Sequence, residues 1–292
     1  MANTVVYNKH DYVTKLRQRL GKITTWKDIL NVMTSDVRTI VKGVVSVEPS
    51  VVAGTRGTAY NYEDFTIAAD TLTINGMKQI PMFIDEADRT QQAYFGSPEI
   101  ADFQGKKINE KLESLTLAEH ASWTDFGSGD LTNSSADDTT QITVSAANIA
   151  NIVRAIKRKV YKNNGADLAT ENGFFIVWRP EDYELLEGFV QANGFNEADV
   201  ALKNGIPIGM RYLGVNHYLS TQHTANHLFA GVRRIGELGL LRGTYGKVKF
   251  IEDPAKVSGL GVVSRLDYGF KWPPNGPSTQ ALKQLLVDVN VV

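Results

Sequence analysis

The chain has 292 residues, of which 42% are hydrophobic and 22% are charged, a composition that suits one large domain or two ordinary domains with hydrophobic cores. Its 31 Lys and Arg residues are balanced by 32 Asp and Glu residues, so no overall charge marks it as a binder of nucleic acid or membrane surfaces. The absence of cysteine excludes disulfides, thiolate catalysis and cysteine-based zinc sites.

The N-terminal segment, residues 1–35, is predicted to be a basic arm. Tyr12, Leu16 and Leu20 are spaced four apart, which predicts a short amphipathic helix. Residues 1–22 carry one acidic residue and five basic ones: Lys9, Lys15, Arg17, Arg19 and Lys22. The segment lacks the apolar centre of a signal peptide, and no apolar run in the chain reaches the roughly 18 residues of a membrane span. We therefore expect a soluble protein that is made in the cytoplasm and does not contact a membrane.

A strand and a long hairpin are predicted next. Residues 36–47 are rich in Val and Ile and indicate a strand. Apolar residues then recur around 65–74, are interrupted at Asn75–Gly76, and resume in a second segment at 77–85. Asn-Gly is a strong signal for a tight turn because both residues tolerate a positive φ angle. A two-stranded element is only marginally stable in water on its own, so we expect this hairpin to lie on another surface.

A long helix is predicted to follow the hairpin. Ser97 is a suitable N-cap, Pro98 a suitable first helical residue, and Glu99 places a favourable charge in the first turn. The helix is predicted to carry an apolar side made of Ile100, Phe103, Ile108, Leu112 and Leu115. Residues 124–141 are the most turn-rich segment and are predicted to be a domain boundary.

The second half of the chain is predicted to mix helices and strands. Ser145 is predicted to cap a helix with an apolar stripe made of Ile149, Ile152, Val153, Ile156 and Val160. The outer face of this helix is basic and carries Arg154, Lys157, Arg158, Lys159 and Lys162. We expect solvent, or an acidic partner such as residues 119–138 of a neighbouring subunit, to face it. A buried strand is predicted at 174–178 and a helix from Pro180, followed by strands at 209–219, 227–231, 247–253 and 261–272.

Two stretches in this order of elements resemble the major capsid proteins of tailed bacteriophages, which have the Hong Kong 97 fold. In many of these proteins a TLTID-like strand, a turn with Asn or Asp, a nearby Lys and an aromatic-x-I-D-x-x-D-x-x-Q run lead from an extended loop into a spine helix. The residues that match this pattern are Thr71 to Ile74, Lys78, Phe83, Ile84, Asp85, Asp88 and Gln91. Residues 205–220 resemble the Gly-punctuated segment of the family's axial domain.

The resemblance implies an α+β, Hong Kong 97-like capsid fold. Its implied parts are an N-terminal arm (1–35), an extended loop with its base (36–85), a peripheral domain with the spine helix (86–141), an axial domain (142–246), and the closing strands of the peripheral domain with a C-terminal tail (247–292). The implied function is that of a major capsid protein, without enzymatic activity, which assembles with itself into the pentamers and hexamers of an icosahedral shell around double-stranded DNA.

The same resemblance implies locations, partners and contact residues. The protein would be made in the host cytoplasm, reside in the virion capsid, and meet a portal and a scaffolding protein. The hairpin tip would lie on a neighbouring subunit, so the candidate contact residues are Ile74, Asn75, Gly76, Met77 and Lys78. The basic residues of the arm would contact DNA phosphates or the scaffold. Some family members cross-link a Lys of the extended loop to an Asn of a neighbour, which would use Lys78, but no matching partner motif is found.

No catalytic, cofactor or metal site is predicted. The chain has no phosphate-binding loop, G-x-S-x-G or H-E-x-x-H motif. His217, His223 and His227 form the densest histidine group, but their segment holds no carboxylate to complete a metal site, and we interpret them as ordinary histidines. We interpret the carboxylates at 85–88 as charges that favour a helix start rather than as an acid–base pair.

Two alternatives stay open. A bacterial nanocompartment (encapsulin-like) shell protein can share this fold but packages enzymes. A more remote alternative is a soluble α/β enzyme with its site near the histidines at 217–227.

Overall fold

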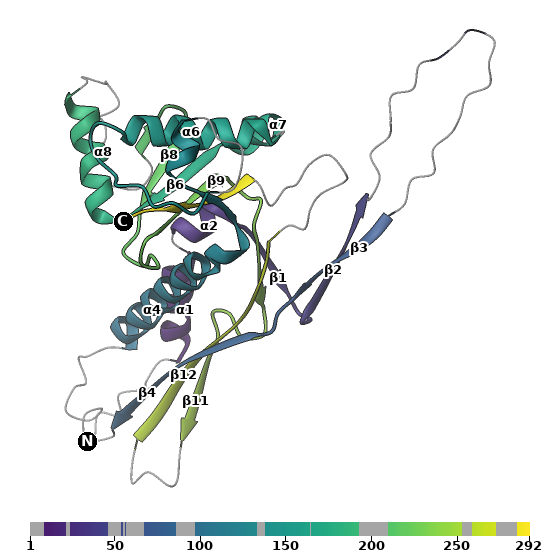
Figure 1. The fold of residues 1–292 in the computed structure, drawn as a ribbon. Helices are drawn as coiled ribbons and strands as arrows, with labels where there is room; N and C mark the ends of the chain where they lie inside the picture. The colour runs from purple at the N-terminus through teal and green to yellow at the C-terminus, as the bar shows by residue number, and fades with distance from the viewer. Residues whose placement is uncertain are drawn as a thin grey trace, which may run out of the picture.

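The computed structural model shows a mixed α+β protein with two sheets and a separate two-stranded ribbon (Figure 1). It describes residues 9–21, 24–45, 54, 56, 67–85, 97–132, 138–163, 165–192, 210–252, 259–272 and 285–292. Within these ranges, no helix is both long enough and apolar enough to cross a membrane.

The first sheet has five strands, β1 (Asn31–Ser35), β4 (Gly76–Asp85), β10 (Glu237–Leu241), β11 (Val248–Glu252) and β12 (Gly259–Lys271). The 13-residue strand β12 organises this sheet. It pairs antiparallel with β4 along one edge and with β11 and then β10 along the other. The strands predicted at 247–253 and 261–272 are therefore confirmed, and they pair with each other.

Helices α1 (Lys9–Gly21), α2 (Thr25–Ile29) and α4 (Ser97–Leu117) pack with this sheet around one hydrophobic core, and the short helix η1 (Ala118–Ser122) continues α4. Leu16 and Leu20 of α1 are buried, as the spacing predicts. Gly105 of α4 lets α1 approach closely, because a Cβ there would come within 2.8 Å of the Arg19 side chain. From Lys9 onward the N-terminal segment is therefore an amphipathic helix that packs on α4.

Helix α4 begins at Ser97, the residue predicted to cap it, and buries only part of the predicted apolar side. Ile108 and Leu112 are buried, whereas Phe103 is 54% exposed, so its predicted burial is wrong. The neighbouring Gln104 takes the buried position, and its Oε1 accepts a hydrogen bond of 2.6 Å from the Ser264 hydroxyl of β12. The side of the helix that carries Gln104 therefore faces the sheet. The side chain of Ile100 lies outside the described part of the structure.

The second sheet has six strands, in the order β5 (Thr124–Phe126), β13 (Leu286–Asn290), β9 (His227–Val232), β6 (Phe174–Trp178), β8 (Val215–Leu219) and β7 (Met210–Tyr212). Helices α5 (Ser128–Leu131), α6 (Ile149–Lys162), α7 (Ala166–Asn172) and α8 (Pro180–Ala192) accompany this sheet (Figure 1). Strand β6 lies between β9 and β8, and all five of its residues are buried, as predicted.

Helix α6 buries its whole predicted apolar stripe against this second core. It begins at Ile149 with Asn148 as its N-cap, so the predicted start at Ser145 is wrong. The side chain of Asn148 instead accepts a hydrogen bond of 2.9 Å from the backbone N–H of Ser145. The preceding segment therefore turns into the helix rather than forming its first turn.

The C-terminal strand β13 has a central place in the second sheet. It pairs parallel with β5 and antiparallel with β9. Of the residues expected to form closing strands and a C-terminal tail (247–292), β11 and β12 belong to the first sheet and β13 belongs to the second. Part of the predicted boundary at 124–141 is likewise structured, because it forms β5 and α5.

The prediction of a hairpin around Asn75–Gly76 is wrong. Strand β3 (Ile67–Thr73) pairs with β2 (Thr39–Val45), while β4 pairs with β12, so the two predicted arms do not pair with each other. Gly76 has no positive φ angle. Its lack of a side chain serves packing instead, since a Cβ there would lie 2.5 Å from the ring of Tyr268. The chain therefore runs on from the ribbon into the first sheet.

Candidate functional site

The β2–β3 ribbon projects away from both sheets (Figure 1). Its seven residue pairs run from Thr39 opposite Thr73 to Val45 opposite Ile67. Because side chains of directly paired residues share a face and alternate along the strands, Val41 and Ile67 lie on the same face. These two side chains are 63% and 61% exposed. The ribbon therefore presents an apolar face that its own chain leaves uncovered in the described residues.

The base of the ribbon is fixed to the first sheet. Lys42 of β2 forms an ion pair with Glu237 of β10, and Lys271 of β12 forms one with Asp70 of β3. Leu72, at the end of β3, is only 2% exposed. Polar and apolar contacts thus hold one end of the ribbon while its outer part carries the exposed face.

The predicted contact residues lie at this base and not at a hairpin tip. Ile74 is 1% exposed and is part of the core. Asn75 and Lys78 are exposed, Gly76 is half-buried against Tyr268, and Met77 is 51% exposed. Residues 46–66 connect the two strands of the ribbon, and most of them lie outside the described ranges. The predicted position of the tip is therefore wrong, because the strand after Asn75 pairs with β12.

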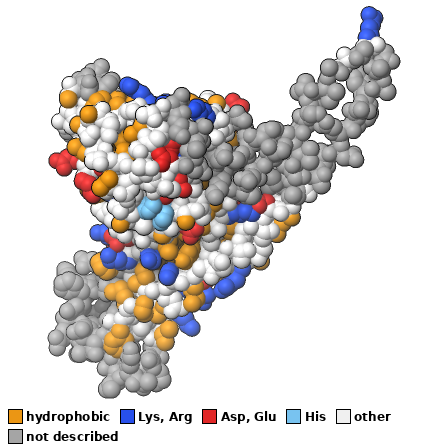
Figure 2. Space-filling view, in the orientation of Figure 1, with side chains coloured by type: hydrophobic (Ala, Val, Ile, Leu, Met, Phe, Trp, Pro, Cys, Tyr) orange, Lys and Arg blue, Asp and Glu red, His pale blue; other side chains and the backbone are white. Residues whose placement is uncertain are grey.

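Strand β4 carries a second exposed apolar stripe. Met77, Pro81 and Phe83 alternate along one face of the strand, and Met77 and Phe83 are 51% and 45% exposed. Figure 2 shows hydrophobic side chains gathered over the part of the molecule that holds β4, β11 and β12. Asp85 is the last residue of β4 and does not begin a helix, whereas Glu86, Asp88 and Gln91 lie outside the described residues.

The basic residues of α1 are partly engaged within the chain. Arg17 donates a hydrogen bond of 3.4 Å to the carbonyl of Gly246, and Arg19 lies 3.7 Å from a carboxylate oxygen of Asp102. Lys15 is exposed. Lys9 begins the helix but its side chain is not among those described, and Lys22 lies outside the described residues. The basic segment is thus a docked helix with Lys15 and Arg17 at the surface.

One residue of the predicted basic face of α6 is buried in the interior. Lys159 is buried, and its ammonium lies 3.0 Å from a carboxylate oxygen of Asp130, which is also buried. Asp130 belongs to the acidic segment 119–138, so this acid meets α6 within one chain. The remaining residues of the face line a shallow hollow with Tyr161: Arg154, Lys157, Arg158 and Lys162.

The three histidines of the 217–227 segment do not converge. His217 is fully buried, accepts a hydrogen bond of 2.9 Å from Trp178 Nε1, and has its other ring nitrogen 3.2 Å from the carbonyl of Tyr212. Burial lowers the pKa of His217 to about 4, and burial also lowers the pKa of His223 to about 4. His217 is thus a satisfied core histidine, in line with its interpretation as ordinary.

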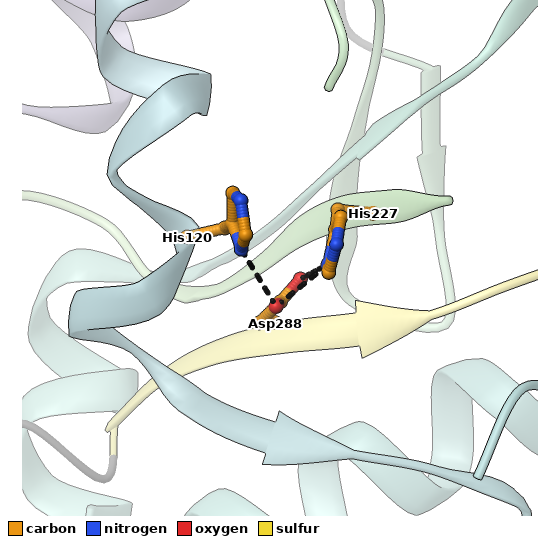
Figure 3. A group of neighbouring side chains, drawn as sticks. All are labelled: His120, His227 and Asp288. Atoms are coloured by element: carbon orange, nitrogen blue, oxygen red, sulfur yellow. Dashed lines mark hydrogen bonds and ion pairs between the residues drawn. The ribbon is translucent and has the colours of Figure 1, made fainter. Parts of the chain in front are cut away.

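His227 instead meets two residues from distant parts of the chain (Figure 3). His120 comes from η1, His227 from the start of β9, and Asp288 from β13. One carboxylate oxygen of Asp288 lies 2.8 Å from His227 Nδ1 and 3.4 Å from His120 Nδ1. The two imidazole rings stack with their centroids 3.9 Å apart.

The electrostatics of this cluster are dominated by burial of the carboxylate. Burial raises the pKa of Asp288 to about 7; the charge of His120 opposes this shift and that of Asp125 adds to it. Burial also lowers the pKa of His227, against the charge of Asp125. No sequence motif indicates this cluster, because its members belong to three separate elements and the pairing of β13 with β9 brings Asp288 to His227.

Comparisons with known proteins give structural matches only. No protein-family model and no curated protein sequence matches the chain. A structure from Mycobacterium phage Adephagia is similar with a TM-score of 0.61 at 14% identity, over 93% of this chain and 91% of that one. The mature capsid of bacteriophage PhiM1 is similar with a TM-score of 0.58 at 13% identity, over 93% of this chain and 88% of that one. A virus-like particle from Pyrococcus furiosus is similar with a TM-score of 0.57 at 10% identity, over 96% of this chain and 98% of that one.

Proposed function

We propose, from the phage major capsid protein fold of this chain, that it is a coat protein that assembles with itself into the hexamers and pentamers of an icosahedral shell around double-stranded DNA. The proposal starts from the fold, because the structures similar to this chain include the mature capsid of PhiM1. The exposed apolar face of the β2–β3 ribbon is the observation that carries the proposal beyond the fold.

That ribbon needs a partner for physical reasons. An isolated pair of strands is marginally stable in water, and this pair exposes Val41 and Ile67 on one face. A second copy of the chain can cover this face, and repetition around a symmetry axis then buries the same surface in every subunit. Stable interfaces bury more than about 1,000 Å² in total, which a ribbon and a flanking strand such as β4 can together supply.

The finer layout follows from the resemblance and remains part of the proposal. The first sheet with α4 would be the peripheral domain, the second sheet the axial domain, and the β2–β3 ribbon the extended loop. Lys15 and Arg17 would face DNA phosphates or a scaffold without reading sequence. The portal and the scaffolding protein would be the other partners, the virion the location, and the host cytoplasm the place of synthesis. The role would be structural and not catalytic.

A nanocompartment shell is the second candidate. It is favoured by the match to a virus-like particle from Pyrococcus furiosus, which covers 98% of that chain. The two candidates share the shell and differ in what it contains. The subunit surfaces described above would serve both.

The contents of the particles distinguish the two candidates. Particles isolated from the cells that naturally make the protein are expected to hold double-stranded DNA that survives DNase until the shell is opened. Extraction and electrophoresis of the protected nucleic acid is the measurement. Particles without DNA that contain a second protein in fixed proportion would instead identify a nanocompartment.

A further inference from the structure

The cluster of His120, His227 and Asp288 combines three metal-ligating side chains from three elements (Figure 3). We propose that these residues form a binding site for one Zn²⁺ ion. The site would be additional to the proposed shell function and does not depend on it. A bound ion would stabilise the folded subunit, whichever assembly the subunit forms.

The separations between the donor atoms suit a tetrahedral ion. Zinc binds imidazole nitrogen and carboxylate oxygen at about 2.0–2.2 Å, so neighbouring ligand atoms of a tetrahedral site lie about 3.3 Å apart. Asp288 Oδ2 is 2.8 Å from His227 Nδ1 and 3.4 Å from His120 Nδ1, and all three donors lie within 4.8 Å of one another. The backbone therefore already places each donor within reach of a common ion.

Ion binding requires the two stacked imidazoles to turn. In the stacked arrangement the rings are 21° from parallel, whereas ligation directs both Nδ1 lone pairs at one point. The His120 and His227 side chains are 26% and 24% exposed, which leaves room for this rotation. Asp288 is fixed in β13 with its side chain 2% exposed. Because both imidazoles are partly exposed, an ion has a route in and water can complete the coordination.

The charge and the chemistry of the donors favour zinc over harder cations. A second carboxylate belongs to Asp125, the residue of β5 that pairs with Asp288 of β13, and it accepts a hydrogen bond of 3.3 Å from Asn290 Nδ2. Two neighbouring carboxylates favour a divalent cation at this position. Two nitrogen donors and one carboxylate suit Zn²⁺, whereas Ca²⁺ and Mg²⁺ prefer oxygen ligands throughout.

A bound ion would connect the two halves of the molecule. His120 lies in η1, which continues the helix packed on the first sheet, while His227 and Asp288 lie in the second sheet. Zinc would cross-link these elements in the folded protein and would find no preformed site in the unfolded chain. It would therefore raise the thermal stability of the subunit.

Zinc titration of the untagged, full-length protein, stripped with a chelator and dialysed, tests the site. We expect isothermal titration and elemental analysis to give one Zn²⁺ per chain, and saturating zinc to raise the unfolding temperature by about 5 °C. Cobalt substitution should give the visible absorption of a four- or five-coordinate ion. The variants His120→Gln, His227→Gln and Asp288→Asn should each bind at least roughly tenfold more weakly.

The control is Asp167→Asn, which changes an exposed carboxylate of α7 that is not part of the cluster and should leave zinc affinity unchanged. Circular dichroism establishes that each variant is folded, and His120→Gln changes a partly exposed side chain, so it separates loss of a ligand from loss of the fold. The proposal is overturned if the parent protein binds no stoichiometric zinc, or if a folded His120→Gln/His227→Gln protein binds zinc as tightly as the parent.

Discussion

Replacing Val41 and Ile67 together by Asp is expected to abolish shell assembly and leave the subunit folded. Both side chains lie on one face of the β2–β3 ribbon and are more than 60% exposed. The substitutions should therefore change the folding stability of the unassembled subunit only slightly. In an assembled shell the same positions would be covered, and each unpaired charge buried at an interface costs about 2–5 kcal/mol. Because every subunit would carry both charges, the penalties repeat across the shell. Size-exclusion chromatography and electron microscopy measure the loss of particles.

The matched control is Val292→Asp, the same change at another exposed valine, which lies at the C-terminus away from the ribbon. Circular dichroism and thermal unfolding of all variants verify that the subunits remain folded. Shells that form normally from the double variant would show that this face is not an interface.

Lys159→Met is expected to destabilise the subunit by about 3–5 kcal/mol. The substitution leaves Asp130 as a buried carboxylate without its cationic partner, and its Oδ1 already has no hydrogen-bond partner in the described structure. At about 2–4 °C for each kcal/mol in a chain of this size, the unfolding temperature of unassembled subunits should fall by roughly 10 °C. Thermal and urea unfolding of the unassembled protein measure the change.

A second substitution tests the cause of this loss. Asp130→Leu in the Lys159→Met background removes the stranded charge and should restore much of the stability, because a buried ion pair can be replaced by apolar residues at little net cost. Lys162→Met on the same helix changes an exposed lysine and should alter stability by no more than about 0.5 kcal/mol. Equal effects of Lys159→Met and Lys162→Met would contradict a stabilising role for the buried pair.

The parts of the fold that sequence alone predicts are those set by local patterns. The start of a helix at Ser97, the apolar stripe of α6 and the buried strand β6 each depend on neighbouring residues, and the structure confirms all three. The mixed α+β class and the phage major capsid protein fold are confirmed as well, the second by the structural matches.

Sequence alone does not predict which strands pair with each other. Asn75–Gly76 has the local signature of a turn, yet the ten residue pairs between β4 and β12 keep the chain extended there. The ribbon is made by β2 and β3, so the candidate contacts shift from residues 74–78 to Val41 and Ile67. Phe103 shows the same limit, because Gln104 rather than Phe103 faces β12, where it accepts a hydrogen bond from Ser264.

The histidine cluster shows why sites can escape motif searches. Its members belong to η1, β9 and β13, and no spacing in the sequence relates them. The histidine-rich segment at 217–227 instead distributes its residues between the core and the surface of the second sheet. Only the antiparallel register of β13 with β9 places Asp288 beside His227.

Electron cryomicroscopy of the purified full-length protein tests the central proposal most directly. We expect closed icosahedral shells in which hexamers and pentamers are visible, with the β2–β3 ribbon of each subunit lying on its neighbour so that Val41 and Ile67 are covered. A protein that stays as single folded chains at high concentration, or shells in which this face points into solvent, would contradict it.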